Sequence, residues 1–264
     1  MFSRFRLFAS EDNLFLNNFY RPELIKINLS DTLLSFNCPV SSSWREDSHD
    51  LLIDDICLSD NSDYQLPQAD LFYTENKYKH KTIFYREWSL WGSAWNSECL
   101  GVTSMMVKLI HVPSKTPDDC LFVYDKLKEA LPSLVNKGYQ DGAKASKIGG
   151  GLMRNHRNVS YSRARVNEGH PDRVYDRMYF TIDCEHVLLV EHYNAKAPYL
   201  NDDIFRAMEF FVDKIYSSIR IVRSDKADES RKTANKKYAE STGAYYDEEL
   251  GDVLETINFP SDDE

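Results

Sequence analysis

The segment from Arg173 to Arg223 constrains the fold most strongly, because its elements follow one another with short connections. Arg173–Asp183 is rich in aromatic and β-branched residues, which are typical of a strand. The pair at 184–185 predicts a tight turn, and His186–Asn194 predicts the second strand of a hairpin.

A helix is predicted directly after this hairpin. Asn201, Asp202 and Asp203 are suitable N-terminal capping residues for a helix over 204–219. Apolar residues recur along one side at helical spacing: Ile204, Met208, Phe211, Ile215 and Ile219. Such a stripe faces a core. We therefore interpret this segment as the scaffold and expect any functional surface to lie beside it.

The chain upstream supplies more strands. Leu24–Leu29 and Thr32–Cys38 predict a hairpin, and Lys81–Trp95 predicts a long central strand that is covered on both faces. Leu100–Val112 is expected to be its antiparallel neighbour, and Asn158–Val166 alternates like a strand. These elements indicate an α+β fold, with one antiparallel sheet of about six or seven strands and helices packed on it.

Three regions are expected along the chain: an N-terminal arm over 1–23, an α+β domain over 24–223, and an acidic C-terminal tail over 224–264 with a surface helix near Ser230–Ser241. Asp118 is a further predicted N-cap, for a helix that includes Leu121 and Leu127. The alternative is two half-domains divided in the glycine-rich loop over 137–151.

Composition narrows the class of protein. The formal net charge is −10, which argues against a primary nucleic-acid binder. The five cysteines are odd in number and widely spaced without a C-x-x-C pair, so we expect neither a disulfide framework nor a zinc site. The N-terminus is a poor signal peptide, and no stretch has the length of apolar sequence that a membrane span needs. A cytoplasmic protein without membrane contact is the prediction.

Charge is distributed unevenly. The segment from Lys137 to Arg177 contains nine Lys and Arg residues and four acidic residues, whereas residues 225–264 contain twelve acidic residues and five basic ones. The basic region could receive the acidic tail, an acidic partner or nucleic acid, although a solvated sheet face is the simpler explanation.

No motif predicts catalysis, a metal or a cofactor. His186 and His192 lie on one strand, roughly 20 Å apart at the usual rise of a strand, so they cannot share a metal. Neighbouring Glu191 and His192 point to opposite faces and form no dyad. The alternative is a hydrolase whose site is assembled from distant residues such as Cys99, His156 and His192.

A partner-binding surface is the remaining hypothesis. Aromatic and arginine side chains are favoured at the centres of interfaces. The candidate residues are Trp88, Trp91 and Trp95 of the long strand and Arg154, Arg157, Arg163 and Arg165 of the basic region. Core packing is the alternative for the tryptophans.

Several of these segments together resemble a known class of protein fold. The segments YFTID, HVLLVEHY and FFVDKIYSSIRI, with the hairpin LSDTLLSFNCPV, are similar to the Mog1/PsbP-like α/β sandwich. The resemblance covers about Leu24–Arg223, and that class includes bacterial effector chaperones and proteins similar to type VI secretion immunity proteins. It implies a non-enzymatic protein that binds a cognate toxin or effector, either as an immunity protein or as an effector chaperone. A homodimer is left open.

Overall fold

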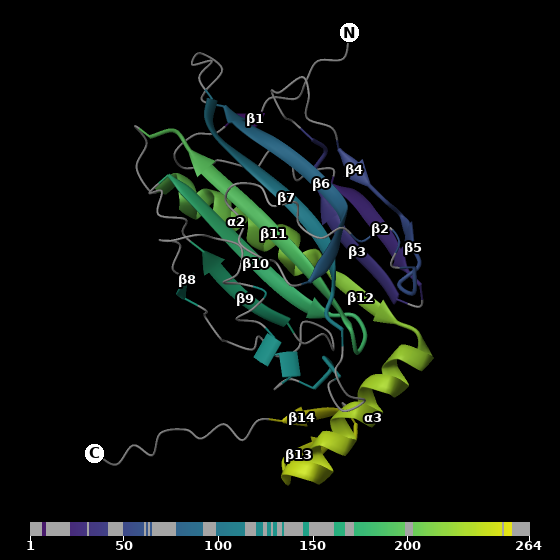
Figure 1. Cartoon of the computed structure of the whole chain (residues 1–264). Helices are drawn as coiled ribbons and strands as arrows, with labels where there is room; N and C mark the ends of the chain where they lie inside the picture. The colour runs from purple at the N-terminus through teal and green to yellow at the C-terminus, as the bar shows by residue number, and fades with distance from the viewer. Residues whose placement is uncertain are drawn as a thin grey trace, which may run out of the picture.

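The structure is a computed structural model of the whole chain (Figure 1). It describes residues 7–8, 22–30, 32–41, 50–60, 62, 64, 78–91, 99–113, 120–123, 126–127, 129–130, 134, 145–147, 161–166, 172–198, 203–249 and 251–254.

The largest element is an eight-stranded sheet with the order β1-β6-β7-β11-β10-β9-β8, to which β4 adds by pairing with β6. All of its pairs are antiparallel except β1 with β6. Its strands are β1 (Leu7–Phe8), β4 (Leu51–Leu52), β6 (Lys79–Trp91), β7 (Cys99–His111), β8 (Ala145–Lys147), β9 (Tyr161–Val166), β10 (Arg173–Thr181) and β11 (His186–Lys196). The sequence predictions of β6, β7 and the β10–β11 hairpin are confirmed.

A separate four-stranded sheet has the order β12-β3-β2-β5. Its strands are β2 (Glu23–Leu29), β3 (Thr32–Cys38), β5 (Asp55–Ile56) and β12 (Arg220–Arg223). The β2–β3 hairpin is confirmed, and Ser30 at its turn has a φ of 55°, in the left-handed region. The prediction of one sheet of six or seven strands is wrong, because β3 pairs with the distant β12 rather than with the large sheet. The α+β class, with mostly antiparallel sheets, is confirmed.

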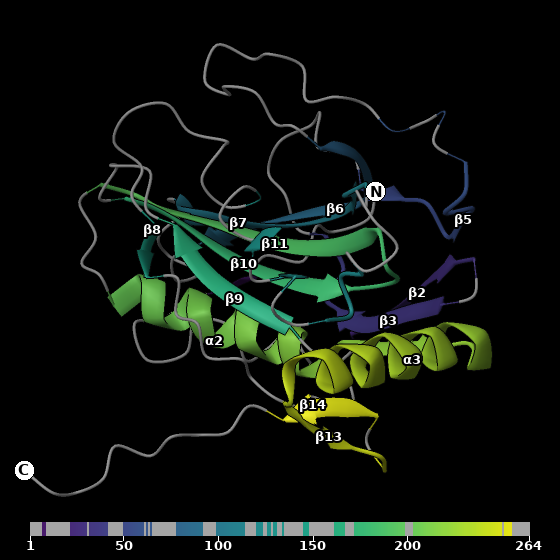
Figure 2. The ribbon, with the colours of Figure 1, turned by 60° about the horizontal axis from the view of Figure 1, so that its bottom comes forward.

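Helix α2 (Asp203–Ser218) lies with the small sheet on one face of the large sheet (Figure 2). The predicted apolar stripe is buried at Met208, Phe211, Ile215 and Ile219, while the side chain of Ile204 is outside the described residues. Phe36 of β3 meets Phe84 of β6 edge to face, with ring centroids 5.2 Å apart. The core is therefore the layer between the two sheets and α2.

A second apolar cluster lies on the opposite face of the large sheet. Leu121 and Leu127 pack there against Tyr179, Val187 and Leu189. Residues 121–123 form a turn and a bend, and the described residues 126, 127, 129 and 130 are helical, so the predicted helix does not include 121–123; its proposed N-cap, Asp118, is outside the described residues.

The same segment carries a disulfide between Cys120 and Cys184. The expectation of no disulfide is therefore wrong. A separation of 64 residues leaves no local signal in the sequence.

The C-terminal region forms a small unit of its own, with α3 (Asp225–Thr242) beside a hairpin of β13 (Tyr245–Asp247) and β14 (Asp252–Leu254). Ser224 caps α3, and the helix is longer than the predicted Ser230–Ser241. The buried side chains of Arg231 and Asn235 both donate to the carbonyl oxygen of Gly251, at 3.1 and 3.2 Å. In the described part of the chain, no helix has the length and apolar character that crossing a membrane requires.

Candidate functional site

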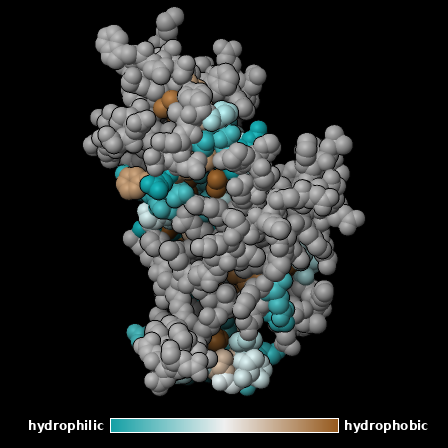
Figure 3. Space-filling view, turned by 90° about the vertical axis from the view of Figure 1, so that its left-hand side faces the viewer, coloured by the Kyte–Doolittle hydropathy of each residue, from teal (hydrophilic) through white to brown (hydrophobic). Residues whose placement is uncertain are grey.

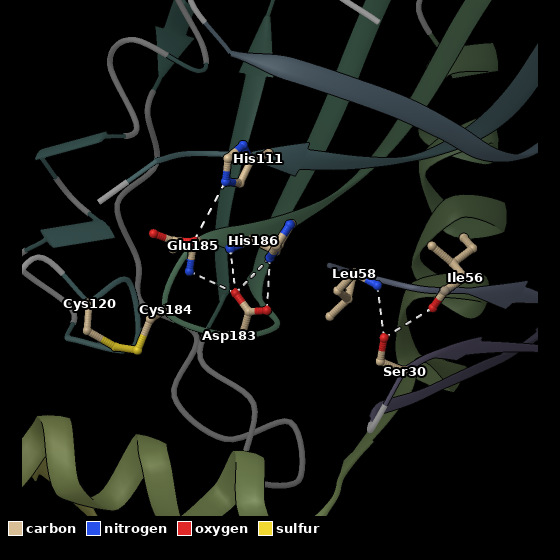
Figure 4. Close-up of polar contacts among 9 residues, drawn as sticks. All are labelled: Ser30, Ile56, Leu58, His111, Cys120, Asp183, Cys184, Glu185 and His186. Atoms are coloured by element: carbon tan, nitrogen blue, oxygen red, sulfur yellow. Dashed lines mark hydrogen bonds and ion pairs between the residues drawn. A yellow bond between two sulfur atoms is a disulfide. The ribbon is translucent and has the colours of Figure 1, made fainter. Parts of the chain in front are cut away.

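A cluster of histidines and carboxylates lies at the tip of the β10–β11 hairpin (Figure 4). Both carboxylate oxygens of Asp183 lie 2.9 Å from Nδ1 of His186. The backbone N–H groups of Glu185 and His186 also donate to Oδ1 of Asp183, at 2.8 and 2.7 Å. This turn therefore fixes the carboxylate against the imidazole ring through side-chain and backbone contacts.

His111 at the end of β7 completes the cluster. It is the register partner of His186, and the two ring centroids are 5.1 Å apart. Its Nε2 lies 3.7 Å from Oε2 of Glu185. The ring of Tyr64 packs against both histidines, with centroid distances of 6.3 Å to His111 and 6.0 Å to His186. Three rings and two carboxylates from separate parts of the chain thus meet at one sheet end.

Burial and hydrogen bonding set the charges in this cluster. Burial acts to raise the pKa of Asp183, but the hydrogen bonds from His186 and the backbone hold that pKa below its ordinary value. Burial, with the negative charge of Asp183, raises the pKa of Tyr64, so its phenol stays neutral. The Tyr64 hydroxyl and Nε2 of His186 are both buried without a hydrogen-bond partner in the described part of the chain.

A carboxylate that holds Nδ1 of an imidazole leaves Nε2 to exchange a proton, which is the arrangement of a general base and its orienting group. Asp183 and His186 have this geometry. Within the described ranges, no group of three or more His, Cys, Asp or Glu side chains is arranged to hold a metal ion.

The Cys120–Cys184 disulfide borders this cluster directly, since Cys184 lies between Asp183 and Glu185 (Figure 4). The carbonyl oxygen of Cys184 accepts from the Leu121 N–H at 3.1 Å, and that of Glu185 accepts from the Val112 N–H at 2.7 Å. The hairpin tip is therefore joined to Cys120 by one covalent bond and to Val112 and Leu121 by one hydrogen bond each.

Of the proposed partner-binding residues, Trp88 is in the core. Its side chain is 0% exposed, and its ring centroid lies 5.1 Å from that of Phe211. Its Nε1–H lies within hydrogen-bonding distance of the carbonyl oxygens of Pro39 and Val40, at 3.3 and 3.1 Å. The prediction that Trp88 binds a partner is corrected accordingly, because a completely buried side chain that contacts Phe211 of α2 and the chain just after β3 cannot reach another protein.

For each of the other predicted partner-binding residues, either the whole residue or its side chain is outside the described part of the chain. Trp95, Arg154 and Arg157 are outside the described residues. Trp91 is the last residue of β6, and its side chain is not described. Arg163 and Arg165 lie in β9, where their backbone partners in β10 are Met178 and Asp176, but their side chains are not described either.

Of the three residues of the hydrolase alternative, the structure describes Cys99 and His192, and each is bound within its own surroundings. His192 is completely buried, with its ring 4.8 Å from that of Tyr216. Cys99 donates from its sulfur to the Gly101 carbonyl oxygen at 3.3 Å, and burial raises the pKa of its thiol. His156 lies outside the described residues. Glu191 contacts Arg177 rather than His192, which confirms that these neighbours point apart.

A second candidate feature is the outer face of the four-stranded sheet, here called the small-sheet face. It consists of Leu24, Leu33 and Val222 with the polar Lys26, Asn28 and Ser35 between them. Leu33 and Val222 are cross-strand partners, 38% and 60% exposed, and Leu24 is 54% exposed. On the side of the molecule in Figure 3, the described apolar residues show as small separate brown spots.

Exposed apolar side chains gather in and around this sheet. Eight large apolar residues are exposed in the described part of the chain, and three of them lie on the small-sheet face: Leu24, Leu33 and Val222. Val40 follows β3 by two residues, and Leu51 and Leu52 form β4 of the large sheet, which precedes β5 in the chain. The other two, Phe210 and Tyr245, lie on α2 and β13. Clustering of this kind marks interaction surfaces, whereas isolated exposed apolar residues are ordinary.

Comparison with protein-family models, with curated proteins and with solved structures gives no match to this chain. The resemblance to the Mog1/PsbP-like class therefore stays a prediction.

Sequence reasoning did not find either feature. Asp183 and His186 are three residues apart across a turn, and an Asp-x-x-His pattern at a hairpin tip is the signal that could have suggested their contact. The small-sheet face needs the pairing of β3 with β12, for which the sequence holds no local signal.

Proposed function

We propose that this chain is a non-enzymatic binding protein that neutralises a cognate secreted toxin or effector by direct contact. The observation that carries the proposal is the gathering of exposed apolar residues at the small-sheet face. In an interface, such residues form the dry centre and polar neighbours form the rim. The alternation of Leu24 with Lys26 and of Leu33 with Ser35 supplies both kinds of residue on one surface.

The geometry of this face suits a protein partner. Cross-strand pairs in a sheet hold their side chains in fixed positions, so Leu33 and Val222 lose little conformational freedom on binding. The net charge of −10 favours a partner of opposite charge, because complementary fields speed association.

The finer assignment rests on the resemblance to the Mog1/PsbP-like class. An immunity protein covers its toxin in the cytoplasm of the cell that makes both, so a cytoplasmic location is part of the proposal. An effector chaperone would use the same surface to carry its effector rather than to inactivate it. A toxicity assay separates the two, since only an immunity protein restores growth to cells that express the free toxin.

The first experiment is isothermal titration calorimetry of the purified protein with the product of an adjacent toxin-like gene. Saturable binding with a fixed stoichiometry is expected. No heat of binding over a range of temperatures would remove the proposal. Analytical ultracentrifugation of the protein alone then shows whether it forms a homodimer, and a dimer that Leu33→Asp/Val222→Asp dissociates would use the same face as the partner.

A hydrolase is the second candidate function, and the Asp183–His186 pair is the observation that favours it. Asp183 holds the ring, and Nε2 of His186 is buried, so it would act as a general base only on a water molecule or substrate group that enters the cluster. We expect a hydrolase to turn over model esters or peptides and to lose this activity in both His186→Ala and Asp183→Asn. Equal residual rates in the wild type and both variants would exclude the pair.

A further inference from the structure

The three residues at the tip of the β10–β11 hairpin each hold a different group. Asp183 holds the imidazole of His186, Cys184 is bonded to Cys120, and Glu185 lies beside His111. In the chain, Cys184 therefore stands between the two carboxylate residues of the histidine cluster. None of these residues belongs to the small-sheet face, so a role for the disulfide does not rest on the proposed function.

We propose that the Cys120–Cys184 disulfide is a site of thiol–disulfide exchange through which a dithiol controls the order of the histidine cluster. A thiolate of the dithiol attacks Sγ of Cys184, the S–S bond breaks, and Cys120 leaves as a thiolate that takes up a proton. The second thiol of the reductant then attacks the mixed disulfide and releases the thiol of Cys184. The dithiol ends as a disulfide, and the protein gains two electrons and two protons.

Exposure decides which sulfur is attacked. Cys120 is buried, with 5% of its surface exposed, whereas Cys184 at the hairpin tip is half-buried. An attacking thiolate approaches along the S–S axis from the side of the sulfur that it attacks. The more accessible sulfur is therefore attacked, and the other one leaves. Cys120 is accordingly the leaving group.

Breaking the disulfide affects the histidine cluster because the bond holds the hairpin tip, and the backbone of the tip holds Asp183 against His186. The bond ties the tip to Cys120, whose neighbour Leu121 packs with Leu127 in the apolar cluster on the outer face of the sheet. After reduction, the hydrogen bond from the Leu121 N–H to the Cys184 carbonyl oxygen still joins the tip to this segment, and the one from the Val112 N–H to the Glu185 carbonyl oxygen joins the tip to the end of β7. The backbone of residues 183–186 positions Asp183 against His186, so greater motion at the tip loosens that contact.

The free cysteines provide an internal control. Burial raises the pKa of the Cys38 thiol to about 12, so Cys38 does not compete as a thiolate. Cys57 is exposed, and a hydrogen bond with Ser59 lowers the pKa of its thiol, so it reacts without reductant. Reduction should therefore change the reactivity of Cys120 and Cys184 selectively.

The test begins with thiol counting on the full chain. One sample is denatured and alkylated directly, and a second is treated with dithiothreitol, freed of the reagent, and then denatured and alkylated. Three thiols are expected before reduction and five after it. Hydrogen–deuterium exchange of the folded protein then compares peptides over 110–123 and 181–188 with and without dithiothreitol. At short exchange times, which sample local opening, we expect exchange in both peptides to rise several-fold on reduction, while peptides of β2 and β3, which exchange through global unfolding, stay unchanged over those times.

Two variants separate exchange at this bond from other effects of the reagent. Cys120→Ser/Cys184→Ser should exchange rapidly in both peptides whether or not dithiothreitol is present, and Cys99→Ser should respond as the wild type does. Five thiols before reduction, or equal exchange in the oxidised and reduced wild type, would overturn the proposal. The wild-type comparison stands even if the double variant does not fold.

Discussion

Removal of the Cys120–Cys184 bond should cost a large part of the stability of this protein. The bond closes a loop with a sequence separation of 64 residues, which includes β8, β9 and β10. In the chain-entropy description, a cross-link over a loop of this length restricts the unfolded chain by an amount worth about 4 kcal/mol at 25 °C. Domains are typically stable by about 5–15 kcal/mol, so the loss would be visible in any unfolding experiment.

The assay is urea unfolding at pH 7, followed by far-UV circular dichroism and tryptophan fluorescence. The wild type is measured with and without dithiothreitol, beside Cys120→Ser/Cys184→Ser and the control Cys99→Ser. The reduced wild type and the double variant should both lose about 4 kcal/mol, and the reductant should have no further effect on the double variant. A wild type whose unfolding midpoint does not move when thiol counting shows complete reduction would refute the reasoning.

Three further predictions concern buried groups. Trp88→Ala should destabilise the protein by about 3–5 kcal/mol in urea unfolding, because it empties a completely buried site. Glu191→Ala should cost about 3–5 kcal/mol, since it takes this carboxylate from the buried guanidinium of Arg177, and a Glu191→Gln/Arg177→Met double variant should recover part of the loss. The folded-state pKa of Asp183 is depressed, so its pairing with His186 stabilises the protein above the unfolded pKa of about 3.9 and is lost as pH falls through the folded value. Asp183→Asn should therefore flatten the fall in stability measured between about pH 5 and pH 3.

Local patterns predicted the parts of the fold that are local in origin. Alternation and turn residues were sufficient for the β2–β3 and β10–β11 hairpins, and capping with the apolar stripe was sufficient for α2. Trp88 and its neighbours Ser89 and Leu90 are all buried, as a strand covered on both faces requires.

Long-range pairing was not predictable in this way. The division into two sheets depends on β12 joining β3, and the disulfide depends on two cysteines on different sides of β8 to β10. The histidine cluster was missed for the same reason: His186 was compared with His192 along one strand, whereas its actual neighbours are His111 on the adjacent strand and Asp183 across the turn.

The most direct test of the binding function is calorimetric titration of the partner with surface variants of this chain. Leu33→Asp/Val222→Asp places two charges at the centre of the small-sheet face, and Phe210→Asp makes a similar change at a 55% exposed residue on α2. Burial of one apolar side chain is worth about 1.5–3 kcal/mol, so the double variant should bind at least about tenfold more weakly, while Phe210→Asp should bind as the wild type does. Wild-type affinity in a double variant with an unchanged circular dichroism spectrum would contradict the account.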